Sequence, residues 1–247
     1  MNGSITANAT YSGAATHNRS AGPGGSIKVT AGALAGSGTI SANGARNAGY
    51  ACGGGGRIAI RLTGKDATFA AFEGQIVASG RYSADSKPAG SGSAGTVYLQ
   101  TAAEAEGLGT IRIANLNADG YGNAKNPNTT EIASLGYGGD EIVSYKRAKY
   151  SLGYCGRAAV NADLQAASVE LTETTAALDL EGHKLKVAKL TGVSSEGAVI
   201  KVKPGTYTAA QLTTLGLAVI DSSVDENGEN ATGSVEVSGD GLLIVIR

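Results

Sequence analysis

The chain of 247 residues carries 20 basic and 21 acidic side chains, so its formal net charge is −1. This balance removes the electrostatic case for a nucleic-acid partner, and no apolar run approaches the about 20 residues of a membrane-spanning helix. Glycine is unusually abundant, with 38 residues, and on composition alone this leaves both an ordered and a low-complexity chain open.

The two ends of the chain and its two cysteines indicate where the protein is located and which cysteine chemistry to expect. Residues 1–5 have neither the charged nor the apolar region of a signal peptide, so we expect a cytosolic chain or a fragment. Strand-like segments begin at Gly3 and continue to Arg247 without a polar cap, which favours a C-terminal piece of a longer protein. Cys52 and Cys155 match no metal-ligand spacing. One disulfide or two unpaired thiols remain open, and the second is favoured.

Segments that alternate apolar and polar residues recur in the first half at a nearly fixed period. The first series begins at Gly3, Gly38, Gly74 and Gly109, with spacings of 35, 36 and 35 residues. A second, interleaved series begins at Gly25, Gly56, Gly95 and Asp140. Alternation of this kind is typical of a strand with one buried face, and a fixed period is typical of repeat proteins.

The two series predict an all-β chain that forms a right-handed parallel β-helix, or β-solenoid, with protruding glycine-rich loops. Equivalent isoleucines would stack at about 4.8 Å per coil, and glycine would allow the sharp corners. A propeller is the competing fold. It needs four antiparallel strands per repeat joined by hairpins, whereas long glycine-rich loops separate the strands here.

Residues 158–247 keep the strand pattern but lose the period. We expect strands over 168–171, 177–180, 185–190, 198–202, 217–221, 234–237 and 242–246, a turn over 203–207 and a short helix over 208–215. The chain is therefore divided into β-helix repeats of about 35 residues over 1–157 and shorter β coils or a C-terminal strand-rich cap over 158–247.

At this level the sequence resembles a known group. The glycine-rich stretches 24–29, 36–44 and 53–60 look like the β-helix repeats of large bacterial surface and autotransporter-passenger-like proteins, and 178–187, 204–210 and 233–237 are similar to their C-terminal strand repeats. The resemblance implies an extracellular or cell-surface origin and a stalk or adhesin role, with glycans or host-surface proteins as partners. It carries over no catalytic residue.

The motifs that carry chemistry are sparse. Residues 90–95 match GxGxxG, but a strand rather than a helix follows, so a glycine loop is favoured over a dinucleotide site. Of the two histidines, His183 is expected in a solvent-facing turn, and His17 lies in a loop where binding is conceivable. Residues 225–230 resemble a calcium loop in content but not in spacing, so no metal or cofactor is expected.

Paired carboxylates would indicate the alternative function, because β-helix folds host polysaccharide lyases and glycoside hydrolases. The aligned positions expected to face outward carry none; they are Thr6, Ser41, Val77 and Arg112 in the first series and Lys28, Ala59 and Tyr98 in the second. The close pairs Asp140–Glu141 and Asp179–Glu181 have no aligned partner. A non-enzymatic module is favoured over a carbohydrate-active enzyme.

A tyrosine recurs early in each inserted loop. The four are Tyr11, Tyr50, Tyr82 and Tyr121. Stacked coils would place these loops on one side, as a ridge that binds glycan or protein through aromatic faces and nearby polar groups such as Asn126. The competing interpretation is that each tyrosine anchors its own loop by packing. Tyr137, Tyr145, Tyr150 and Tyr154, with Lys146, Arg147, Lys149 and Arg157, form a second aromatic and basic group, which marks a binding surface or merely the transition between halves.

Overall fold

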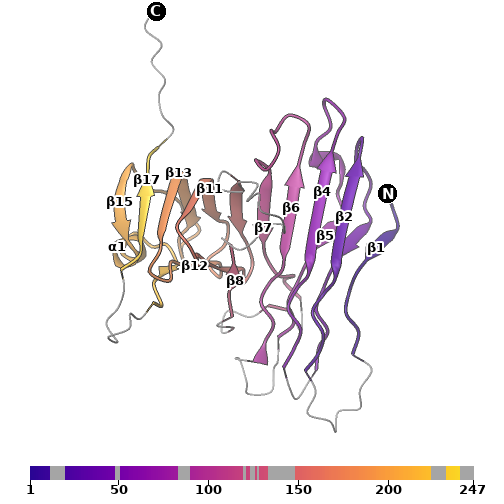
Figure 1. Ribbon diagram of the computed structural model, residues 1–247, viewed down its shortest axis with the longest axis horizontal. Helices are drawn as coiled ribbons and strands as arrows, with labels where there is room; N and C mark the ends of the chain where they lie inside the picture. The colour runs from indigo at the N-terminus through magenta and orange to yellow at the C-terminus, as the bar shows by residue number, and fades with distance from the viewer. Residues whose placement is uncertain are drawn as a thin grey trace, which may run out of the picture.

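The structure is a computed structural model that describes residues 1–11, 20–47, 51–82, 90–118, 121–122, 126, 128–132, 148–223 and 232–239. These residues form a strand-rich chain with parallel sheets, which agrees with the predicted all-β class. Figure 1 shows the strands side by side along the long axis, with the N-terminus at one end and the only described α-helix at the other.

Two parallel sheets organise the first half. One consists of β1 (Ser4–Thr6), β3 (Thr39–Ser41) and β5 (Gln75–Val77), and its register aligns Ile5, Ile40 and Ile76. The other begins with β2 (Ser26–Ala31), β4 (Arg57–Leu62) and β6 (Thr96–Gln100), which align Ile27, Ile58 and Val97. Three strands of each predicted series thus pair in the expected register. The Asp140 segment lies outside the described residues.

The segment at Gly109 departs from the prediction. Its strand, β7 (Thr110–Ile113), does not join β5; it pairs antiparallel with β6 and parallel with β9 (Lys149–Leu152) in the larger sheet. Only residues 101–109 separate β6 from β7, which suffices for an antiparallel neighbour but is too short for a crossover. The expectation that this segment continues the first series is therefore wrong, and β5 is the edge of its sheet.

In the second half the paired strands are closer in sequence. The larger sheet continues through β11 (Leu164–Leu171), β13 (Lys184–Val193) and β17 (Ser234–Val237). A third, parallel sheet consists of β8 (Thr130–Glu131), β10 (Arg157–Ala159), β12 (Ala177–Asp179) and β16 (Val219–Ile220). Leu164 pairs with Leu185, 21 positions on, whereas Ile5 pairs with Ile40, 35 positions on.

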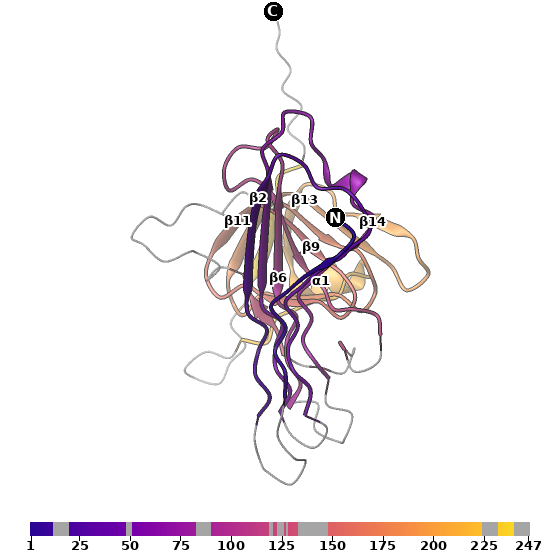
Figure 2. The same ribbon diagram turned by 90° about the vertical axis from the view of Figure 1, so that its right-hand side faces the viewer.

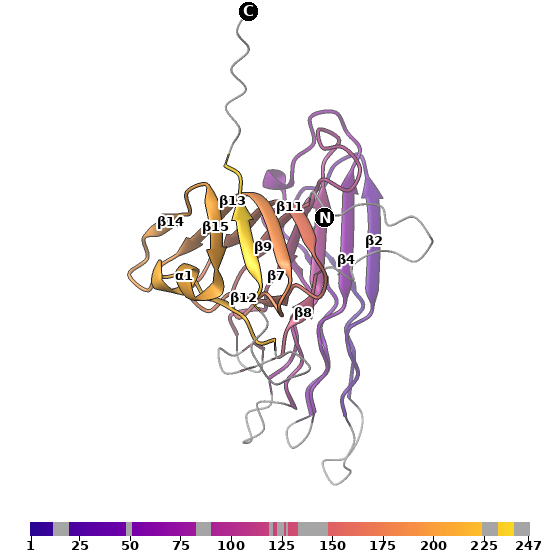
Figure 3. The same cartoon turned by 60° about the vertical axis from the view of Figure 1, so that its left-hand side comes forward.

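The far end closes with short antiparallel elements (Figure 3). β14 (Val199–Lys201) pairs with β13, β15 (Gly205–Thr208) pairs with β17, and α1 (Ala209–Thr214) follows directly. A capping box between Thr208 and Gln211 begins the predicted short helix. The turn expected over 203–207 is wrong beyond Pro204, because pairing with β17 draws the following residues into a strand.

Two clusters of buried aliphatic side chains form the core. Ile40, Ile58, Ile60 and Leu62 belong to the first, between the sheets of the N-terminal half. Leu178, Leu185, Leu190 and Tyr150 belong to the second. A short 3-10 helix, η1 (Phe69–Ala71), lies beside the first cluster; Phe72 belongs to this cluster and Phe69 packs against it. The division of the chain at residue 157 stays a prediction.

Candidate functional site

The feature that most distinguishes the molecule is a pair of backbone layers that extend beyond the sheets (Figures 1 and 2). We call these segments the glycine legs; they comprise residues 7–11, 20–25, 42–47, 51–56, 78–82 and 90–95. Within one layer Ala9 N donates to Asn43 O and Gly44 N to Ser79 O, both at 2.9 Å. The legs within one layer therefore lie side by side.

Hydrogen bonds also join the two layers of legs directly. The N–H groups of Gly25, Gly56 and Gly95 donate across the molecule to the carbonyls of Ala7, Ala42 and Ala78, each at 2.7 Å. A Cβ on Gly24 would lie 2.2 Å from the Ala42 oxygen of the opposite layer, and one on Gly55 would lie 2.1 Å from the Ala78 oxygen. Backbone thus packs on backbone, and glycine is needed because no side chain fits between the layers.

Side-chain amides connect the backbone along the stack, and those of Asn43 and Asn115 are buried whereas that of Asn8 is exposed. Asn43 N donates to Asn8 Oδ1 at 2.7 Å, and Asn43 Oδ1 accepts from Ser79 N at 2.8 Å. Asn115, which follows β7, accepts through Oδ1 from Gly80 N of the next leg at 2.8 Å, and its Nδ2 donates to Cys155 O at 3.0 Å. We call these three asparagines the asparagine ladder. The sequence reading overlooked it, although Asn8 and Asn43 stand 35 positions apart.

The predicted tyrosine ridge lies at the tips of the legs and is described in part. Tyr50 falls outside the described residues, while Tyr11, Tyr82 and Tyr121 are half-buried. The Arg81 guanidinium lies 3.7 Å from the centroid of the Tyr121 ring, and Arg81 Nε donates to Gly44 O at 3.2 Å. Tyr121 therefore packs against the leg formed by residues 78–82. This contact is the kind that the interpretation of the tyrosines as loop anchors predicts. A binding role for the four tyrosines stays a prediction.

Asn126, which the sequence placed among the polar groups of the ridge, is buried instead. Its Nδ2 donates to Gly92 O at 3.0 Å, and its Oδ1 accepts from Asn128 N at 3.1 Å. The Asn126 amide bonds the backbone of the leg at Gly92, where another backbone group would otherwise be needed. It is therefore not available to a ligand. His17 and residues 225–230 lie outside the described residues.

The second aromatic and basic group does not form one surface. Tyr150 points into the core, is 1% exposed, and burial raises the pKa of its phenol. Its neighbour Lys149 faces outward and forms a 3.0 Å ion pair with Glu104. The alternation of β9 separates the two side chains onto opposite faces. Tyr137, Tyr145, Lys146 and Arg147 lie outside the described residues.

Lys149 borders a groove on the outer face of the larger sheet, beneath the 101–108 loop. The groove has a volume of about 630 Å³, and its floor is formed by small outward residues such as Ala167 and Ala188. Ion pairs Glu104–Lys149 and Lys186–Glu236, both at 3.0 Å, flank it. Burial opposes ionisation of Glu104, but hydrogen bonds from Thr101 and Lys149 outweigh it and lower the pKa. Because these charges are already paired, the groove offers a ligand little charge of either sign.

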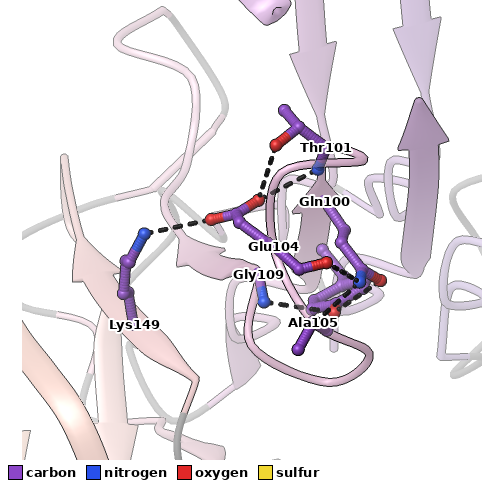
Figure 4. A network of polar contacts seen from close by, with 7 residues as sticks. Gln100, Thr101, Glu104, Ala105, Gly109 and Lys149 are labelled. Carbon is purple, nitrogen blue, oxygen red and sulfur yellow. Dashed lines mark hydrogen bonds and ion pairs between the residues drawn. The ribbon is translucent and has the colours of Figure 1, made fainter. Parts of the chain in front are cut away.

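The 101–108 loop is held by a buried amide (Figure 4). Gln100 Nε2 donates to the carbonyls of Glu104 and Ala105 at 3.2 and 2.9 Å, and Gln100 Oε1 accepts from the Tyr98 hydroxyl at 3.0 Å. Glu104 in turn accepts from Thr101 N at 2.9 Å. The network fixes the loop that reverses the chain between β6 and β7, a role that the sequence did not reveal.

Carboxylates of the second half accept hydrogen bonds from backbone N–H groups that are distant in the sequence. Asp179 Oδ1 accepts from Ser222 N at 3.0 Å, and Asp221 Oδ1 accepts from Gly182 N at 2.8 Å. Burial of Asp221 is outweighed by hydrogen bonds from Ser223, Gly233 and Gly182, so its pKa is lowered. Burial and repulsion from Asp179 and Glu131 raise the pKa of Glu181. Across the described ranges no His, Cys, Asp and Glu side chains gather as a metal site.

Two positions predicted to face outward are buried. Ser41 is 3% and Val77 is 7% exposed, and Arg112 lies against the edge of β5 because β7 has changed sheets. His183 is partly exposed, and its Nδ1 lies 3.8 Å from Asp163 Oδ1. Cys52 and Cys155 are buried and form no disulfide with each other.

Comparisons with protein-family models, with curated proteins and with solved structures gave no match to this chain. Among the described residues no helix has the length and apolar character needed to cross a membrane.

Proposed function

We propose that the chain is a non-enzymatic, adhesin-like structural module that displays its loops from a rigid, right-handed parallel β-helix at the cell surface or outside the cell. The observation that carries this proposal is the arrangement of the glycine legs. Hydrogen bonds of 2.7 Å between the two layers recur at Gly25, Gly56 and Gly95. They hold the legs side by side, and the loops continue from these legs.

Parallel pairing supports the solenoid part of the proposal. Strands β1, β3 and β5 and strands β2, β4 and β6 each follow one another in register, as successive coils of a helix would. The closer pairing of β11 with β13 would then correspond to shorter coils. Such stacking would resist bending, because neighbouring coils are bonded to each other through both their strands and their legs.

The ligand that we propose for the leg tips is a glycan. Tyr82 is half-buried and adjoins Arg81, whose guanidinium is held over the Tyr121 ring. Aromatic faces beside fixed cationic and amide groups suit the mixed apolar and hydroxyl surface of a sugar. Repetition along the stack would bind several sugar units of one polymer at once.

A glycan array tests this proposal on the purified chain. We expect binding to at least one polysaccharide class, weakened at least tenfold in a variant with Tyr50→Ala and Tyr82→Ala. Tyr207→Ala is the matched control, since Tyr207 belongs to β15 at the opposite end and bonds Lys203 O at 3.1 Å. Thermal unfolding of all variants confirms that they are folded. A blank array, or equal binding by both variants, contradicts the glycan proposal.

A second assay addresses the non-enzymatic part. The chain is incubated with acidic and neutral polysaccharides, and reducing ends and unsaturated sugars are measured. We expect no release above a heat-treated sample. Steady release that scales with protein concentration would contradict the proposal and establish a carbohydrate-active enzyme instead.

A further inference from the structure

The change of sheet at β7 leaves a cavity of about 310 Å³ between the edge of β5 and the larger sheet. Its apolar lining includes Phe69, Phe72, Val97 and Leu99, and its polar lining includes Arg112. We call it the Arg112 cavity. Val97 and Arg112 are directly opposed in the antiparallel pair of β6 and β7, so both side chains lie on the same face.

Arg112 supplies a cation that the described part of the chain does not neutralise. Its Nη2 donates to Ile76 O at 2.8 Å, and this is the one hydrogen bond that the described residues give to its five N–H donors. No described carboxylate forms an ion pair with it, and none of the described residues that line the cavity is acidic. Burial lowers the pKa of Arg112, yet a guanidinium stays charged at neutral pH.

The edge of β5 adds a second donor. Gln75 N donates to Gly38 O at 2.9 Å and Val77 O accepts from Ala42 N at 3.0 Å, so both residues direct their peptide groups toward β3. Peptide groups alternate along a strand, and those of Ile76 therefore face the cavity. The Ile76 carbonyl is occupied by Arg112, whereas its N–H is directed toward the same space.

We propose that the Arg112 cavity binds a carboxylate carried on an apolar body. The carboxylate meets the guanidinium, for which planar two-point bonding is the preferred geometry, and the apolar body covers Phe69, Phe72 and Leu99. An anion there replaces the water that Arg112 lost on burial, while a neutral molecule of the same shape leaves the cation unpaired. This inference does not depend on the proposed glycan binding, which concerns the leg tips.

Titration of the purified chain with phenylacetate and phenylacetamide, followed by calorimetry and by NMR shifts of the Ile76 amide, tests the proposal. We expect the acid to bind at least tenfold more tightly than the amide. Arg112→Gln should remove this preference, and Arg61→Gln, on the exposed face of β4, should retain it. Since the acid and amide are compared on the unmodified chain, the test stands even if Arg112→Gln fails to fold.

Peptides ending in phenylalanine identify the source of the carboxylate. A peptide that binds with a free but not an amidated C-terminus indicates a polypeptide end, and binding of phenylacetate alone indicates a free acid. Either result supports the cavity as a carboxylate site. Equal binding of acid and amide, an unchanged preference in a folded Arg112→Gln variant, or no binding of any carboxylate probe overturns it.

Discussion

The side-chain oxygen of Asn43 accepts a 2.8 Å hydrogen bond from the backbone N–H of Ser79, 36 residues along the chain. Asn43 is 6% exposed, and its own N–H donates to Asn8 Oδ1. Asn43 thus connects three neighbouring legs, one through its side-chain oxygen and the other through its backbone N–H. The legs bury only small apolar side chains such as Ala42 and Ala45, so hydrogen bonds from side-chain amides help to hold neighbouring legs together.

The asparagine ladder predicts a large cost for a small substitution. Asn43→Ala leaves the Ser79 N–H buried without an acceptor, which should lower the free energy of unfolding by about 1 to 3 kcal/mol. Urea denaturation measures the change. Lys28→Ala, on an exposed position of β2, is the control and should cost less than about 0.5 kcal/mol. Equal effects of the two substitutions would show that the ladder contributes nothing.

The glycine legs predict a sharp difference between two glycines. Gly56→Ala places a Cβ against the Gly25 carbonyl, where only backbone can move, and should cost more than about 3 kcal/mol or prevent folding. Gly32→Ala meets nothing within 4 Å and should stay within about 0.5 kcal/mol of the parent. Soluble yield and thermal unfolding compare them. A stable Gly56→Ala protein would be inconsistent with the close packing of neighbouring legs.

Asp221 predicts a specific acid sensitivity. Its lowered pKa means that the folded state favours the carboxylate, so its contribution is present above the unfolded pKa of about 3.9 and is lost as the pH falls through the folded pKa. Asp221→Asn should therefore be less stable than the parent at pH 7, and this difference should shrink toward pH 3. Urea unfolding at both pH values measures it.

Asp66→Asn is the control for that experiment, because Asp66 is exposed on a turn. It should change stability little at either pH. If the difference in unfolding free energy between the parent and Asp221→Asn grows as the pH falls, the hydrogen bonds to the Asp221 carboxylate do not stabilise the folded state as proposed.

In the 101–108 loop, we expect the buried amide of Gln100 to contribute more to stability than the neighbouring ion pair of Lys149. Gln100→Ala removes both donors to the loop carbonyls and should cost about 1 to 3 kcal/mol. Lys149→Ala breaks a pair whose lysine is half exposed, so it should cost about 1 kcal/mol or less. Hydrogen exchange over residues 101–109 should accelerate far more in the first variant. The reverse order would refute this ranking.

Local pattern identified most strands of the molecule, and the period gave the partners of the first three strands in each series but not the partner of Thr110–Ile113. Alternation marks Arg57–Leu62 and Thr110–Ile113 equally well, yet the first continues its series and the second changes sheets. That choice depends on the length of the 101–109 connection and on which edge is open, and neither property is encoded in the strand itself. Strand β10, Arg157–Ala159, has no clear alternation and is recognised only by its pairing.

The site residues divide in a similar way. The tyrosine ridge stays a prediction, and Tyr11, Tyr50, Tyr82 and Tyr121 recur once per inserted loop rather than at one fixed position of the repeat. The asparagine ladder is hidden, since Ser79 interrupts it and Asn115 is displaced by one position from the aligned residue Ala114. Arg112 was expected on an outward face, and only the sheet change turns it toward the edge of β5.

The close stacking of the glycine legs also limits how partners can occupy the molecule. Adjacent strands lie about 4.8 Å apart, so three neighbouring legs span roughly 10 Å, far less than the roughly 30 Å width of a small folded domain. A globular partner that reaches one loop must cover its neighbours as well. The number of globular partners bound therefore depends on the molecule as a whole and not on the number of loops. Adding more legs would make each partner dissociate more slowly but would not increase the number of partners bound.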